Sequence, residues 1–269
     1  MPQHISGIDH LVILVSDLDQ AAATYQRLGF TVSPRGLHSP HMGTGNHTIM
    51  LRDDYFELLA VVSPTDINVP MRKWLGSGEG LYATALRTDD AAGMYEELTA
   101  AGVTVNEPVA FQRPVDLPGG GKTEAAFAVT SIQEPGGVRD NIFGCQHMTR
   151  DAVWLPGLMT HANTASGLQA VVGVAEDLDT AAAELAVLFG GNPVREGETV
   201  LFDANGTKVR LRAGGAGGLP LRFTGITFAV EDLDAAADAL KGVPYEQADG
   251  AITVAAEHTH GVDLTFKSG

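Results

Sequence analysis

Cysteine is almost absent from this sequence of 269 residues, which contains only Cys145. A single cysteine cannot form a disulfide within the chain, so the fold has to be held together by its core. Basic residues are also scarce, since 17 Lys and Arg stand against 33 Asp and Glu and give a formal net charge of −16. Because an acidic surface repels phosphate backbones, we expect no nucleic-acid partner.

Long apolar runs are missing as well. No stretch approaches the roughly 20 residues needed to span a bilayer. The first ten residues, MPQHISGIDH, lack the basic start and apolar run of a signal peptide. We therefore expect a cytoplasmic protein with no membrane partner. The content of 44% hydrophobic and 19% charged residues is typical of a globular protein with a large core.

The sequence does contain a repeat. HLVILVSDLDQAAATY begins at His10, AVVGVAEDLDTAAAEL at Ala170 and GITFAVEDLDAAADAL at Gly225. Each copy joins an apolar run typical of a buried strand to an alanine-rich segment with helical spacing, and Ser16 or Asp17 can cap the first of these helices. A weaker copy, LYATALRTDDAAGMYEELTAAGVTV, begins at Leu81.

Three further strands are predicted after each helix. In the first copy they cover residues 30–33, 46–51 and 55–62. The unit is therefore strand, helix and three strands (βαβββ), and one such unit cannot cover its own sheet, so units must pair. We predict an α+β protein with four units in two domains. Their expected boundaries are an N-terminal domain at 1–150, a linker at 151–165 and a C-terminal domain at 166–269.

Side-chain alternation along the strands selects two polar residues. In the first strand, Leu11 and Ile13 form the apolar face that suits the helix, so His10 points to the other face. In DDYFELLAVV, Phe56 and Leu58 form the corresponding apolar face and leave Glu57 opposite. An isolated glutamate in an apolar strand is costly to bury unpaired, which favours a cation or water beside Glu57.

Four paired βαβββ units resemble the vicinal oxygen chelate superfamily, which includes glyoxalase I, extradiol ring-cleavage dioxygenases and bleomycin-resistance proteins. The stretches GIDHLVILVSDLDQAAATYQRLGF, HMGTGNHTIMLRDDYFELLAVV, FQRPVDLPGGGKTEAAFAV and NIFGCQHMTRDAVW are similar to its glyoxalase-like-domain subgroup. The resemblance implies curled mixed sheets around a cleft and one divalent metal. The implied ligands are His10, Glu57 and His147, and imidazole with carboxylate suits Fe, Mn, Ni or Zn.

Several other residues have two interpretations each. His41 and Asn46, in the glycine-rich stretch HSPHMGTGNHT, either contact substrate at the rim of the cleft or belong to a solvated loop. Arg113 either binds a substrate carboxylate through its planar guanidinium or forms a surface salt bridge. Cys145 is expected to pack within its strand. His258 and His260 either lie on one strand face, where they can bind metal adventitiously, or belong to a surface turn, which we favour because no carboxylate on a first strand accompanies them.

The second pair of units has no ligand where the first has His10, because Ala170 and Gly225 stand there. We therefore expect the second pair to be scaffold. The predicted function is a divalent-metal-dependent enzyme acting on a small substrate with adjacent oxygens, by isomerase, lyase or ring-cleavage dioxygenase chemistry, with Glu57 as the base. The alternatives are a metal-free, bleomycin-resistance-like protein with an acidic cleft for a cationic drug, and a partner protein with no active site. Unpaired sheet edges favour a homodimer.

Overall fold

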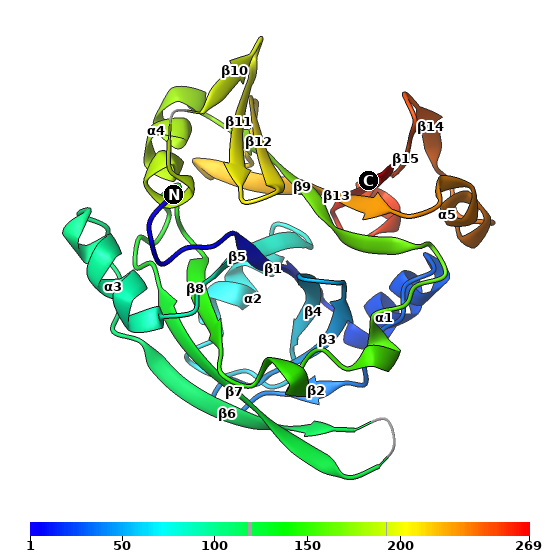
Figure 1. Ribbon diagram of the computed structural model, residues 1–269, viewed down its shortest axis with the longest axis horizontal. Coiled ribbons are helices and arrows are strands. Elements are labelled where there is room, and N and C mark those ends of the chain that lie inside the picture. The colour runs from blue at the N-terminus through cyan, green and yellow to red at the C-terminus, as the bar shows by residue number, and fades with distance from the viewer. Residues whose placement is uncertain (118–119, 192) are drawn as a thin grey trace.

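Two eight-stranded mixed sheets build the protein, as the four repeated units predict. The computed structural model describes residues 1–117, 120–191 and 193–269. The first sheet has the strand order β2-β3-β4-β1-β5-β8-β7-β6, and the second repeats it as β10-β11-β12-β9-β13-β16-β15-β14. The predicted α+β fold of paired βαβββ units is confirmed. We call residues 8–147 the first module and residues 165–268 the second module (Figure 1).

The four units have the following elements. The first two comprise β1 (Ile8–Leu14), α1 (Leu18–Arg27), β2 (Gly36–Leu37), β3 (Thr44–Met50), β4 (Tyr55–Val61), β5 (Gly80–Arg87), α3 (Ala91–Ala100), β6 (Val109–Asp116), β7 (Lys122–Ser131) and β8 (Ile142–His147), with α2 (Val69–Leu75) between them. The last two comprise β9 (Ala165–Ala175), α4 (Leu178–Phe189), β10 (Val194–Glu196), β11 (Thr199–Ala204), β12 (Thr207–Ala213), β13 (Leu221–Val230), α5 (Leu233–Ala239), β14 (Glu246–Ala248), β15 (Ala251–Val254) and β16 (Asp263–Ser268).

An aspartate begins the helix of every unit. Asp17, Asp90, Asp177 and Asp232 each accept hydrogen bonds from backbone N–H groups in the first turn of α1, α3, α4 and α5. These N–H groups have no partner within the helix, so the carboxylate satisfies them and also interacts favourably with the helix dipole. The repeated acidic turn is therefore explained by capping.

One predicted strand is not formed where the sequence placed it. Residues 30–33 are irregular, and the short β2 follows at Gly36–Leu37. The backbone N–H of Thr31 donates to His161 Nδ1, and the Thr31 hydroxyl donates to the carbonyl of Thr160. This segment therefore binds the chain that connects the modules, and Pro34 has no N–H to offer a neighbouring strand.

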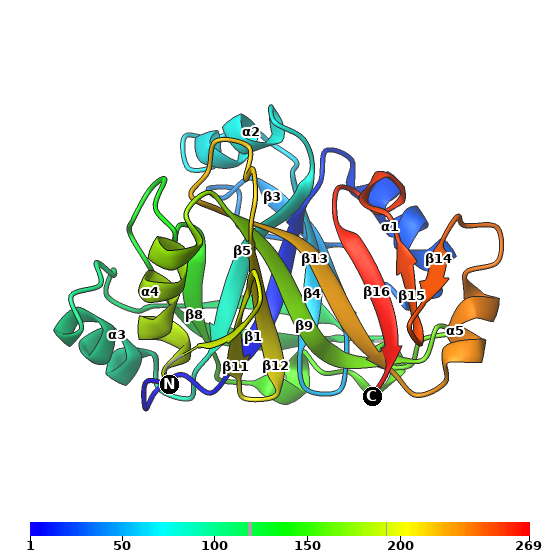
Figure 2. The ribbon, with the colours of Figure 1, turned by 90° about the horizontal axis from the view of Figure 1, so that it is seen from above.

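The two sheets pack back to back through one apolar core. Phe228 of β13 lies 5.2 Å from Phe30 and 5.4 Å from Phe56 between ring centroids, so aromatic rings of both modules meet in its centre. The helices α1, α3, α4 and α5 cover the sides of this core, whereas α2 packs on the concave face of the first sheet (Figure 2). The concave faces consequently point in opposite directions, with the second sheet opening toward the top of Figure 1 and the first curling toward the bottom.

The segment between the modules lies across the concave face of the first sheet. It contains the 3₁₀ turns Arg150–Ala152 and Pro156–Leu158. Trp154 is buried there, and its Nε1–H donates to the carbonyl of Leu51 at 3.2 Å. No helix in the described ranges 1–117, 120–191 and 193–269 is long and apolar enough to cross a membrane.

Candidate metal centre and cavity

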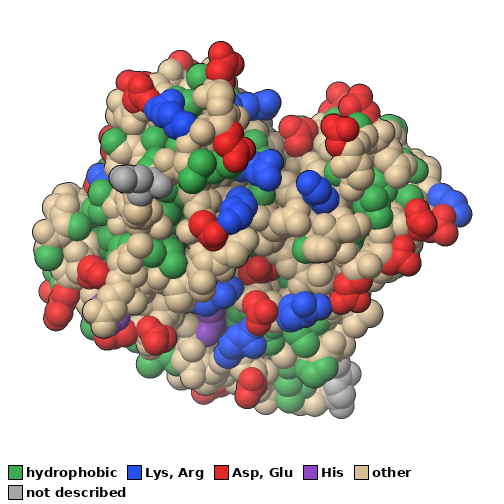
Figure 3. Space-filling model, turned by 45° about the horizontal axis from the view of Figure 1, so that its top comes forward, with side chains coloured by type: hydrophobic (Ala, Val, Ile, Leu, Met, Phe, Trp, Pro, Cys, Tyr) green, Lys and Arg blue, Asp and Glu red, His purple; other side chains and the backbone are tan. Residues whose placement is uncertain are grey.

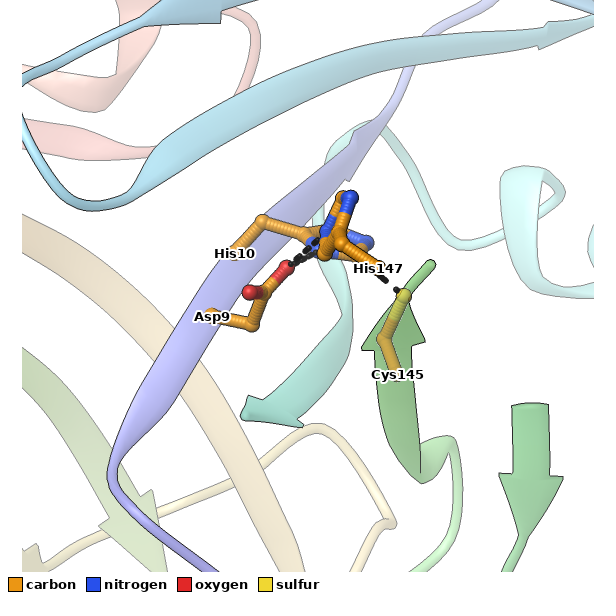
Figure 4. Close-up of side chains that lie close together, drawn as sticks. All are labelled: Asp9, His10, Cys145 and His147. Carbon is orange, nitrogen blue, oxygen red and sulfur yellow. Dashed lines mark hydrogen bonds and ion pairs between the residues drawn. The ribbon is translucent and has the colours of Figure 1, made fainter. Parts of the chain in front are cut away.

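A β-bulge at the start of β1 brings two consecutive polar residues to one place. Ile8 pairs with Leu86 of β5 and His10 pairs with the next residue, Ala85, so Asp9 is the extra residue of β1. Side chains normally alternate along a strand, but a bulge re-aims them. Asp9 and His10 therefore both point toward His147 of β8 (Figure 4).

The Asp9 carboxylate lies between the two imidazoles. Asp9 Oδ1 is 2.7 Å from His10 Nδ1 and 2.9 Å from His147 Nε2, and Arg87 Nε lies 3.6 Å from the other oxygen. Asp9 is 1% exposed and His10 is 4% exposed. Burial alone would raise the pKa of Asp9, but the hydrogen bonds from His10 and His147 outweigh it and hold the pKa well below the ordinary 3.8. Asp9 is thus a buried, ionised carboxylate.

Cys145 completes the cluster. It lies two residues before His147 on β8, and its Sγ is 3.7 Å from His147 Nε2. One donor atom from each of Asp9, His10, Cys145 and His147 lies within 4.8 Å of the others. His147 Nδ1 is buried and has no hydrogen-bond partner among the described residues. We call these four residues the Asp9 cluster (Figure 4).

Aromatic rings enclose the Asp9 cluster. Tyr55 of β4 stacks on His10 at 4.3 Å between centroids, and Trp154 meets the edge of His147 at 4.9 Å. Burial and the negative charge of Asp9 raise the pKa of Tyr55 and of Cys145 well above their ordinary values. Both side chains are therefore uncharged at neutral pH in the absence of a bound cation.

The donor set of the Asp9 cluster fits a divalent metal. Metal-to-ligand distances of about 2.0 to 2.3 Å place neighbouring ligands on one ion about 3 to 4.6 Å apart. The contacts of 2.7, 2.9 and 3.7 Å are close to this range, so small side-chain movements would admit an ion. Two imidazoles, a carboxylate and a thiol are all groups that bind transition metals.

Glu57 belongs to a second polar group on the same concave face. Val12, two residues after His10, is paired with Glu57, so His10 and Glu57 point to the same side of the sheet. Glu57 Oε1 accepts a hydrogen bond from Asn46 Nδ2 at 2.8 Å and lies 4.0 Å from His38 Nε2. Burial lowers the pKa of His38, so this imidazole is neutral. Glu57 is not one of the four residues of the Asp9 cluster.

A cavity of about 250 Å³ lies against this second group. Asn46 and Thr48 of β3 form part of its wall, and Val153 and Leu158 of the connecting segment close it. The charged residues in its described lining are all basic: Arg35, Arg113 and Lys122. This lining does not suit the cationic drug of the bleomycin-resistance alternative.

Arg113 is the cavity's most available cation. Its guanidinium lies over the Phe127 ring at 5.8 Å and has no ion pair with a residue that the structure describes. Arg35, in contrast, pairs with Asp19 at 2.9 Å. Over the face drawn in Figure 3, acidic and basic side chains are intermixed, and little histidine surface is visible. A basic lining in a chain of net charge −16 is a local feature of this cavity.

The structure brings the six predicted site residues into three places. His10 and His147 meet in the Asp9 cluster. Glu57 and Asn46 are bonded to each other, and Asn46 and Arg113 line one cavity. His41 is exposed in a turn and is neither a member of the Asp9 cluster nor among the residues that line the cavity.

Sequence reasoning missed Asp9, Cys145 and His38. The bulge that turns Asp9 inward depends on pairing with β5 and has no signature within β1 itself. A weak signal was present, because an acidic residue directly before a buried apolar strand needs a partner. Cys145 was expected only to pack, although it lies two residues before His147 and so shares one face of the strand with it.

Residues 8–189 match the model of the family described as "Glyoxalase-like domain". No curated protein matches the chain in sequence. Among solved structures, a hypothetical protein from Staphylococcus aureus has a TM-score of 0.71 and 14% identity, covering 97% of this chain and 99% of that one. A mutant 4-hydroxymandelate synthase from Streptomyces coelicolor has a TM-score of 0.62 and 14% identity, covering 99% and 92%.

A variant of homoprotocatechuate 2,3-dioxygenase from B. fuscum has a TM-score of 0.58 and 12% identity, covering 100% of this chain and 73% of that one. At these identities the similarity is one of fold. Two of the three structures are named for enzymes.

Proposed function

Because the chain belongs to the Glyoxalase-like domain family and has the fold of the vicinal oxygen chelate superfamily, we propose that it is a divalent-metal-dependent enzyme acting on a small substrate with adjacent oxygens. The observation that carries the proposal is the Asp9 cluster, in which a carboxylate, two imidazoles and a thiol lie within 4.8 Å of one another. The isomerase, lyase and ring-cleavage dioxygenase classes remain the candidates for the reaction.

His10, His147 and Asp9 would hold the ion. When bound, it would act as a Lewis acid on a pair of adjacent substrate oxygens. Arg87 at 3.6 Å from Asp9 fixes the second carboxylate oxygen and keeps the first one directed at the two imidazoles. Tyr55 fixes the plane of the His10 ring by stacking on it.

Glu57 is the proposed base. Asn46 holds its Oε1, while Oε2 accepts no hydrogen bond from the residues that the structure describes. Glu57 adjoins the cavity through Asn46, which lines its wall, and Oε2 would take a proton from a substrate that reaches it. Arg113 would bind a carboxylate of that substrate through two parallel N–H groups, and the buried wall would exclude water. His41 is a proposed substrate contact only if its turn approaches a bound molecule.

A metal-free binding protein is the second candidate. It is favoured by the hydrogen bonds of Asp9 to both imidazoles, which satisfy this carboxylate without an ion. Under either candidate the partner is a small molecule. Association into a homodimer and a cytoplasmic location stay predictions; the outer strands β2, β6, β10 and β14 each leave one edge unpaired in their sheet.

Elemental analysis tests the proposal. Protein purified without chelator should contain close to one transition-metal ion per chain. His10→Ala and His147→Ala should lose it, and His41→Ala, which alters an exposed turn, should keep it. Absence of any ion after incubation with Fe²⁺, Mn²⁺, Ni²⁺ and Zn²⁺ would refute the enzyme proposal and favour metal-free binding.

Glu57→Gln distinguishes a role of Glu57 as base from a role as metal ligand. As a base outside the Asp9 cluster, it should be dispensable for metal content but required for proton exchange from 2-oxobutanoate into D₂O, followed by NMR. Oxygen uptake with protocatechuate tests the dioxygenase class in the same samples. Loss of the ion in Glu57→Gln would instead assign Glu57 as a ligand.

A further inference from the structure

Cys145 is the only cysteine of the chain, and it is 3% exposed. Its position is set by β8, where alternation sends Cys145 and His147 to the same concave face. Its Sγ lies 3.7 Å from His147 Nε2 and within 4.8 Å of donor atoms of Asp9 and His10. The thiol thus lies among the groups that would hold the ion.

A thiol in this position changes which ion the cluster prefers. Oxygen and nitrogen ligands alone serve Mg²⁺, Mn²⁺ and Fe²⁺, whereas a thiolate selects softer ions, of which Zn²⁺ is the common divalent example. A Zn–S bond is about 2.3 Å long and a Zn–N bond about 2.0 to 2.1 Å. Two such ligands are about 3.5 Å apart at a tetrahedral angle, which is close to the 3.7 Å between Cys145 Sγ and His147 Nε2.

The surroundings give the sulfur no other role. Neighbouring buried residues outside the Asp9 cluster are apolar or aromatic, including Ala85 and Phe127, and within the described part of the chain the thiol's hydrogen bond is with His147. His147 Nε2, the ring nitrogen that faces the sulfur, also lies 2.9 Å from Asp9 Oδ1, so the thiol, an imidazole and a carboxylate meet at one place. A cation bound between His147 Nε2 and Cys145 Sγ accounts for a buried thiol placed among three other metal-binding side chains.

We infer that Cys145 binds the ion as a thiolate beside His10, His147 and Asp9, and that the site therefore prefers Zn²⁺ to Mn²⁺ and Mg²⁺. On binding, the S–H bond breaks, a sulfur–metal bond forms and one proton leaves to solvent, with no change of oxidation state. The inference rests on the proposed function, because it requires an ion in the Asp9 cluster.

Cobalt substitution tests this directly. Apoprotein is prepared with chelator and loaded with Co²⁺, and the absorption spectrum is recorded. A cobalt–thiolate bond produces an intense near-ultraviolet charge-transfer band, which oxygen and nitrogen ligands do not. Because the chain has one cysteine, any such band in the wild type belongs to Cys145. The band should vanish in Cys145→Ser while the weaker visible cobalt bands remain.

His258→Ala is the matched control. His258 and His260 form the other histidine pair of the sequence, and His258 is partly exposed far along the chain from the cluster. This variant should keep the charge-transfer band, which would show that the band does not depend on adventitious binding of Co²⁺ at His258. In competition titrations, Cys145→Ser should lose at least about tenfold in Zn²⁺ affinity and much less in Mn²⁺ affinity.

The outcomes separate the two proposals. Binding of Co²⁺ without a charge-transfer band would overturn the thiolate inference and leave the metal-dependent function standing. Failure to bind Co²⁺ or Zn²⁺ at all would overturn both. If Cys145→Ser does not fold, Cys145→Ala suits the apolar surroundings and carries the same comparison, and the wild-type spectrum decides on its own.

Discussion

Asp54 is a buried carboxyl whose protonation should control stability near neutral pH. It is 8% exposed, and both of its oxygens face one donor, the backbone N–H of Leu168 in the second module, at 3.1 and 3.2 Å. Burial raises the pKa of Asp54 from 3.8 to about 7, more than this hydrogen bond lowers it. The folded protein therefore keeps a proton that the unfolded chain releases, and folding stability falls as the pH rises from about 4 to 7.

The magnitude follows from the two pKa values. Each tenfold difference in proton affinity corresponds to 1.36 kcal/mol, so the penalty is about 2 kcal/mol at pH 5.5 and about 4 kcal/mol at pH 8.5. Asp54→Asn removes the titration and keeps an oxygen for Leu168. Its stability relative to the wild type should therefore increase by about 2 kcal/mol between these two pH values.

Urea unfolding of both proteins at pH 5.5 and 8.5 measures this difference. Asp53→Asn is the control, because the neighbouring carboxylate is largely exposed and should show no comparable pH dependence. If the difference in unfolding free energy between Asp54→Asn and the wild type is the same at pH 5.5 and 8.5, Asp54 is ionised at both pH values and the reasoning from burial is wrong.

Three further changes test the packing of the modules by urea unfolding. Gly261→Ala should cost well over about 1 kcal/mol, because Gly261 has φ +82° and a Cβ there would lie 2.2 Å from a backbone oxygen of the first module. Gly250→Ala is its control, because Gly250 has φ +71° but open space around it, so that only the backbone strain of the positive φ is added. His161→Ala should cost about 2 to 4 kcal/mol at pH 8 because it leaves two backbone groups unpaired. Burial lowers the pKa of His161, so the wild type loses stability below pH 6.5. The difference in stability between wild type and variant should therefore be smaller at pH 5.5 than at pH 8. Phe228→Ala should cost about 3 to 5 kcal/mol and should shift tryptophan fluorescence and circular dichroism together, although both tryptophans precede β9.

The fold was predictable because its signals are local and repeated. An apolar run, an acidic cap and an alanine-rich helix occur in each unit, and each depends on residues adjacent in sequence. The faces of β1 and β4 followed from alternation, so His10 and Glu57 were both expected on the concave side, as their register places them.

The centre of the site was less predictable because its geometry depends on neighbouring strands. Asp9 turns inward through a bulge that only the pairing of β1 with β5 creates. Asn46 meets Glu57 because β3 and β4 pair, although they are 11 residues apart in sequence. The predicted ligands His10, Glu57 and His147 remain to be tested, but geometry separates them into the Asp9 cluster and the cavity group.

The shared core gives the second module a role although its described residues, 165–191 and 193–268, contain no cluster of metal-binding side chains. The helix-facing side of the first sheet, which carries Phe56 and Leu58, is covered by the second sheet, with Phe228 and Phe266 among the rings that meet it. Removing that cover would expose the back of the strands that hold His10 and Glu57, and the positions of these side chains depend on strands that neither bend nor slip. A common shift of both signals in Phe228→Ala would mean that the two modules unfold as one unit, so that selection on the site maintains the core of a module that contributes no ligand to it. Separate transitions would mean that the first module holds its site alone, and the similarity of the second module would then require another reason.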